Sequence, residues 1–126
     1  MRLLTKILLL ALPIFVLAQS GISDKIANLI SSGNETGLKA YFDQSVEVIT
    51  PDGSGVYSQN QAEQVVKKFF DKYPCRSFSV DHQVNSAGGS QLLIGTYMAP
   101  DQSFRTSIFL KQSGEKFLIQ ELSFEE

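Results

Sequence analysis

The sequence predicts an α+β domain in which three helices pack on an antiparallel sheet made of a small hairpin and a meander. Two observations support this prediction. Apolar residues recur at helical spacing in three segments, all of them before residue 74. Between residues 77 and 124 the chain instead shows strand-like runs separated by turn signals, and successive strands on short turns form an antiparallel meander.

Two helices are predicted near the start of the domain. The first covers residues 22–32, ends at Gly33, and carries four apolar residues on one face: Ile22, Ile26, Leu29 and Ile30. The second begins after its cap, Asn34, and is expected to place Leu38, Tyr41 and Phe42 on one side. Gly37 lies inside this second helix, where glycine weakens helical structure.

The third helix has the clearest pattern. Ser58 and Gln61 form an S-x-x-Q capping box at its start, and Pro74 ends it. Lys67 and Lys68 are expected on its exposed face. The other face is apolar and is predicted to enter the core through Ala62, Val65, Val66, Phe69, Phe70 and Tyr73.

The strands begin with a hairpin. Residues 45–50 form its first strand, Pro51-Asp52-Gly53 its turn, and the region of Val56 and Tyr57 its second strand. The meander is predicted over residues 77–85, 91–99, 103–112 and 116–124. In its first strand four residues alternate with polar ones and are expected on the buried face: Phe78, Val80, His82 and Val84.

Two later strands are apolar on both faces. Within residues 91–99, one face carries Leu93, Tyr97 and Ala99, and the other carries Leu92, Ile94 and Met98. Within residues 116–124, alternation separates Phe117 and Ile119 from Leu118, Leu122 and Phe124. A strand without a polar face is typical of a sheet that is covered on both sides.

The first 18 residues have the three parts of a cleavable signal peptide. Arg2 and Lys6 form the charged start, residues 7–17 the apolar centre, and Val16 and Ala18 the small-residue exit. Cleavage after Ala18 would leave Gln19 as the first residue of a single domain, residues 19–126, which we expect to be exported to the periplasm or the extracellular space. A membrane anchor is disfavoured because the apolar run of residues 7–17 is shorter than the ~20 residues that a membrane span needs. No membrane span is therefore expected in the mature form.

Charge and cysteine content exclude several classes of protein. The chain has 11 Lys and Arg and 13 Asp and Glu. Loss of Arg2 and Lys6 with the signal leaves 9 against 13, a net charge of −4, which argues against nucleic acid as a partner. Cys75 is the only cysteine, so the chain contains no internal disulfide, and we expect Cys75 to be a small packing residue rather than a reactive thiol.

Three segments carry a resemblance to a known superfamily: GLKAYFDQSVEV (residues 37–48), SQNQAEQVVKKFF (58–70) and FRTSIFLKQSGEKFLIQEL (104–122). With the order of elements, they resemble the nuclear transport factor 2-like, or cystatin-like, superfamily. More narrowly, they look like a family of small exported Gram-negative bacterial proteins classed as a domain of unknown function. The resemblance implies a strongly curved sheet wrapped around the helices, with a cone-shaped cavity. It carries over no catalytic residue, since no enzyme member's motif matches this chain.

Four residues are candidates for lining such a cavity. His82 is expected on the apolar face of its strand, where an imidazole titrating near neutral pH could act as general acid or base or be a hydrogen-bonded core residue. Tyr41 and Tyr57 come from the short helix and the hairpin, and Thr106 shares its strand's apolar face with Ile108. With one His and one Cys, the sequence predicts no metal site and no cofactor.

Two functions remain open at this point. The first is a non-enzymatic exported domain that binds a small apolar ligand or a protein partner through the cone cavity or the sheet. The alternative is a cofactor-free isomerase- or dehydratase-like enzyme that uses His82 with a Tyr. The strands with two apolar faces also predict a homodimer, because in a cone fold the helices cover only the inner face of the sheet.

Overall fold

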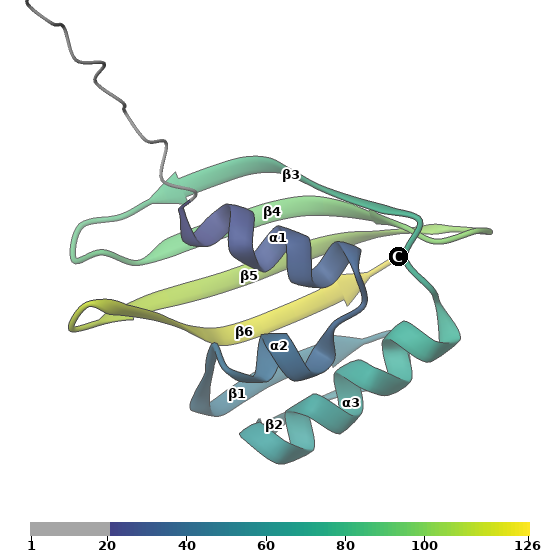
Figure 1. The fold of residues 1–126 in the computed structure, drawn as a ribbon, viewed down its shortest axis with the longest axis horizontal. Helices are drawn as coiled ribbons and strands as arrows, with labels where there is room; N and C mark the ends of the chain where they lie inside the picture. The colour runs from purple at the N-terminus through teal and green to yellow at the C-terminus, as the bar shows by residue number, and fades with distance from the viewer. Residues whose placement is uncertain (1–20) are drawn as a thin grey trace, which may run out of the picture.

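A computed structural model of the protein describes residues 21–126 (Figure 1). The predicted signal peptide, residues 1–18, and the predicted cleavage site between Ala18 and Gln19 lie outside the described residues. Within the described part of the chain, no helix is both long enough and apolar enough to span a membrane.

The elements follow the predicted order. The helices are α1 (Ile22–Ser31), α2 (Glu35–Lys39) and α3 (Gln59–Lys72). The strands are β1 (Phe42–Thr50), β2 (Gly53–Ser58), β3 (Ser77–Asn85), β4 (Gln91–Met98), β5 (Ser103–Ser113) and β6 (Lys116–Glu125). Most boundaries agree with the sequence prediction to within one residue, and β1 is three residues longer at its start.

The six strands form one curved, unclosed sheet in the order β2-β1-β6-β5-β4-β3. The hairpin β1–β2 and the meander β3–β4–β5–β6 are antiparallel, as predicted. They are joined by a parallel pair, β1 with β6, which the sequence did not predict. This pair places the first and last strands of the domain side by side, as the second and third strands of the sheet.

The helices lie on one face of the sheet, with α1 over the meander and α3 beside the hairpin (Figure 1). The prediction that Tyr41 and Phe42 continue the second helix is wrong. The α2 helix ends at Lys39, and Phe42 is already the first residue of β1. Asn34 caps α2 as predicted, since its side chain accepts a hydrogen bond from the Gly37 N–H at 2.7 Å.

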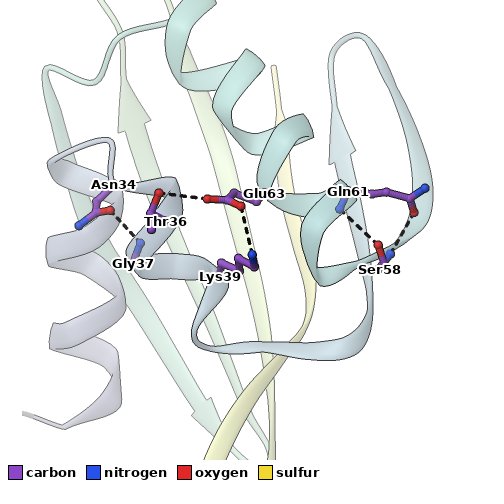
Figure 2. Close-up of polar contacts among 7 residues, drawn as sticks. All are labelled: Asn34, Thr36, Gly37, Lys39, Ser58, Gln61 and Glu63. Atoms are coloured by element: carbon purple, nitrogen blue, oxygen red, sulfur yellow. Dashed lines mark hydrogen bonds and ion pairs between the residues drawn. The ribbon is translucent and has the colours of Figure 1, made fainter.

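Polar contacts join α2 to α3 (Figure 2). Glu63 of α3 accepts a hydrogen bond from the Thr36 hydroxyl at 3.0 Å and lies 3.5 Å from the Lys39 ammonium. The predicted capping box is present at the start of α3, where the Ser58 and Gln61 side chains each bond the other's backbone N–H. The contacts of Glu63 therefore tie α3 to α2.

The core is aromatic where α3 meets the sheet. Phe69 is 3% exposed, and its ring stacks on Phe124 at a centroid distance of 4.1 Å. It also contacts Tyr97 and Phe104, both at 5.1 Å. Phe69 and Phe70 are therefore core residues and Lys67 and Lys68 are exposed, as the helical pattern predicted.

Two β-bulges change the predicted faces of strands. In β6 the register shifts after Ile119, so that Ile119, Leu122 and Phe124 are all fully buried. The prediction that alternation separates Ile119 from Leu122 is therefore wrong, because a bulge adds one residue and restarts the alternation. In β3 the register shifts between Val80 and His82, so that His82 and Val84, both expected on the buried face, are exposed.

Candidate functional site

The four predicted cavity residues do not converge. His82 is on β3 and Tyr57 is on β2, the two edges of the sheet, with four strands between them at about 4.8 Å per step. Because His82 pairs with Ile94, whose neighbours Leu93 and Gly95 face the core, His82 lies on the outer face, away from the helices. The structure brings no tyrosine to this histidine.

Aromatic side chains fill the inner surface of the sheet beside α3. The Tyr97 hydroxyl donates a hydrogen bond to the Tyr73 carbonyl oxygen. Burial raises the pKa of Tyr97 well above its usual range, so its hydroxyl remains protonated and acts as a packing group. Burial also raises the pKa of the partly buried Cys75 thiol, which agrees with a packing role rather than a reactive one.

Thr106 is fully buried on the inner face of β5, and its hydroxyl finds no hydrogen-bond partner among residues 21–126. A buried, unsatisfied hydroxyl destabilises the folded state by ~1 to 3 kcal/mol. Thr106→Val keeps the shape of the side chain and removes the hydroxyl. We therefore expect its free energy of unfolding, measured with urea, to rise by about 1 kcal/mol.

Thr96→Val is the matched control for Thr106→Val. The Thr96 hydroxyl donates to the Asp81 carboxylate at 2.7 Å, so this variant should gain no stability. If Thr106→Val instead loses more than about 1 kcal/mol, the hydroxyl must have a partner such as a buried water.

Among the predicted candidates, Tyr41 lines a cleft. The cleft has a volume of about 1100 Å³ and lies between the start of α1, the α2–β1 connection and the turn between β5 and β6. Ile22, Tyr41 and Phe117 form its apolar part. A second hollow of about 540 Å³, between α1 and α2, shares Lys25, Ala40 and Tyr41 with the first, so the two are neighbours.

Charges of both signs line the cleft. Hydrogen bonds from the Gln120 side chain at 3.0 Å and the Gln44 N–H at 2.7 Å lower the pKa of Asp43 and hold its carboxylate in place. Lys25, Lys116 and Glu115 are exposed at the rim. Sequence analysis missed this site because its residues come from four separate segments whose proximity depends on the β1–β6 pairing.

The outer face of the sheet carries an uncovered apolar row, defined by Val84, Leu92 and Phe109, which stand opposite one another on β3, β4 and β5. Val84 is 53% exposed, and Leu92 and Phe109 are partly exposed. The row continues into two carboxylates, Glu121 and Glu47, which stand opposite each other on β6 and β1. Partial burial, then the charges of Glu47 and Glu125, raise the pKa of Glu121.

Within residues 21–126 no group of three or more His, Cys, Asp and Glu side chains is placed to hold a metal ion. The cleft and the apolar row are two candidate binding surfaces of this domain. The cleft offers polar and apolar groups in a concave site, and the row offers an apolar strip on an open face.

Comparison with known proteins agrees with this fold. A crystal structure of a DUF4783 family protein from Bacteroides uniformis has a TM-score of 0.78 and 24% identity over 84% of this chain and 97% of that chain. A domain of unknown function with a cystatin-like fold from Nostoc punctiforme has a TM-score of 0.62 and 15% identity over 82% and 71%.

An NTF2-like protein of unknown function from Cytophaga hutchinsonii has a TM-score of 0.57 and 12% identity over 85% of this chain and 90% of that chain. No curated protein matches the chain. The family model for the domain of unknown function DUF4783 matches residues 23–125, which is nearly the whole of the described structure. The chain therefore belongs to the DUF4783 family, with an NTF2-like, cystatin-like fold.

Proposed function

We propose that this chain is an exported, non-enzymatic binding domain that engages a protein partner through the outer face of its sheet, and that the simplest such partner is a second copy of the chain. The apolar row of Val84, Leu92 and Phe109 carries this proposal. Each helix packs on the opposite face, so nothing in the described structure covers the row (Figure 1). An apolar strip of this kind favours a protein partner over water.

The arrangement of charge favours one position for a twofold axis. An axis near Glu121 would bring the carboxylates of Glu47, Glu121 and Glu125 in two copies together, which is repulsive. An axis near Leu92 and Phe109 instead packs the apolar row on its own symmetry mate and leaves the carboxylates at the rim. The proposed dimer is therefore centred on β4 and β5.

Pairing can be measured by sedimentation of the purified chain at micromolar concentrations. We expect a dimer, and we expect Phe109→Glu to weaken pairing at least about tenfold, because a carboxylate at the centre of an apolar interface loses its hydration. Gln64→Glu is the control. It adds the same charge on the exposed face of α3, in the helix layer, and should leave pairing unchanged. A native chain that sediments as a monomer would refute the homodimer.

Export is supported by the N-terminal pattern of charged start, apolar centre and small-residue exit. We expect intact-mass measurement on protein recovered from the producing cells to give a chain that begins at Gln19. A mass that still includes residues 1–18 would contradict both the cleavage site and the export assignment.

The enzymatic alternative has less support from the geometry. It required His82 and a tyrosine in one cavity, whereas His82 is exposed on the outer face and Tyr57 is at the other edge of the sheet. General acid–base chemistry needs both groups within hydrogen-bond reach of one substrate. Binding through the sheet therefore remains the better proposal.

A further inference from the structure

The cleft beside Tyr41 contains an unpaired strand edge. On one side, β6 pairs with β5 from its first residue, Lys116, which stands opposite Ser113. On the other side, β6 pairs with β1 only from Ile119, which stands opposite Phe42. Residues 116–118 thus have a strand neighbour on one side only, and the β5–β6 hairpin projects past the start of β1, at the left of Figure 1.

Hydrogen-bond alternation identifies which backbone groups face the empty side. Residues opposite each other in an antiparallel pair alternate between bonding across the pair and pointing away from it. The Ile119 N–H donates to the Tyr41 carbonyl at 2.7 Å, so Ile119 points away from β5. Phe117, two residues earlier, has the same orientation, and its N–H and C=O therefore face the cleft, where no described residue bonds them.

The side chains around this edge suit an extended peptide. A strand laid beside residues 116–118 would turn alternate side chains inward, toward the apolar group of Ile22, Tyr41 and Phe117. Its other side chains would face the solvent-exposed rim with Lys25, Lys116 and Glu115. The rim has charges of both signs, so a peptide without a strong net charge meets no repulsion there.

We propose that this cleft is a second binding site, distinct from the outer face, that takes an extended peptide segment by β-strand addition to residues 116–118. The backbone groups of Phe117 provide the hydrogen bonds, and the pocket formed by Ile22, Tyr41 and Phe117 selects an apolar side chain at alternate positions. The occupant is a segment of a partner protein in strand conformation, because an unpaired strand edge recognises backbone in that conformation.

The probe is a capped six-residue peptide of alternating valine and threonine, added to the purified chain at up to millimolar concentrations while amide signals are followed by NMR. We expect saturable shifts of the amides of Phe117 and Tyr41. The same peptide with N-methyl groups on alternate backbone nitrogens keeps the side chains and loses half of its N–H donors. Two such peptides are compared, one methylated on each edge of the strand. We expect the peptide methylated on the edge that faces β6 to bind roughly tenfold more weakly than the unmethylated peptide.

Phe117→Pro tests the same edge from the protein's side. Proline removes an N–H that points away from β5, so no bond between β5 and β6 is lost. We expect Phe117→Pro to weaken peptide binding roughly three- to tenfold, with little change in the midpoint temperature of thermal unfolding of the protein. If this variant does not fold, the comparison of methylated and unmethylated peptides still decides.

Three results would overturn the proposal: no saturable shift, equal binding of the peptides methylated on either edge, or shifts centred on the edge strands β2 or β3. The last result would move strand addition to the edges of the sheet. Because Phe109→Glu lies on the outer face, it should leave peptide binding unchanged. Failure of the dimer and failure of this site are therefore separate outcomes.

Discussion

Phe69→Ala is expected to lower the free energy of unfolding by ~3 to 5 kcal/mol, because it removes a large buried ring and leaves a cavity. Phe69 is a ring of α3 that packs on several strands of the sheet. It stacks on Phe124 of β6, meets Phe104 of β5 edge-on at an interplanar angle of 75°, and lies 5.1 Å from Tyr97 of β4. Its loss therefore weakens contacts to three strands at once.

Urea unfolding, followed by far-UV circular dichroism, measures this loss. Lys68→Ala is the control, since Lys68 precedes Phe69 in α3 but is exposed and should change stability by less than about 0.5 kcal/mol. A loss below about 1 kcal/mol for Phe69→Ala would mean that α3 does not pack on the sheet through this ring.

The regular parts of this fold could be predicted because local signals agree with one another. In α3 the apolar spacing, the capping box of Ser58 and Gln61, and Pro74 all indicate the same helix. The meander followed from turn residues between apolar runs. The parallel β1–β6 pair had no such local signal, because it joins residues such as Phe42 and Ile119 that are far apart in sequence.

The candidate site was much less predictable. His82 was expected to be buried because strict alternation was assumed from Phe78 onward, and one bulge reversed its direction. The cleft depends on where β1 starts relative to β6, which no local pattern reports. For the β3 bulge, the sequence did offer one signal: Gly95 is an isolated glycine in a strand, and such a glycine often marks a bulge or a close approach of another backbone.

Gly95→Ala is expected to destabilise the domain by about 3 kcal/mol or more, through overpacking in a rigid place. Gly95 stands opposite Val80, directly before the β3 bulge. A Cβ at this position would lie 2.2 Å from the Ser79 carbonyl oxygen and 3.0 Å from the Phe78 ring. The nearest atom belongs to the backbone, so a change of side-chain rotamer cannot relieve the clash. Strand β3 must move away from β4.

Gly21→Ala is the control for Gly95→Ala, since nothing lies within 4 Å of an added Cβ there and the change should cost less than about 1 kcal/mol. Hydrogen exchange would locate the damage. We expect amides of β3 and β4 to lose protection first, while those in the β1–β6 pair keep it, because β3 is an edge strand attached to the sheet through β4. A Gly95→Ala variant as stable as the native chain would mean that β3 does not approach β4 this closely, and the bulge that turns His82 outward would then lose its physical cause.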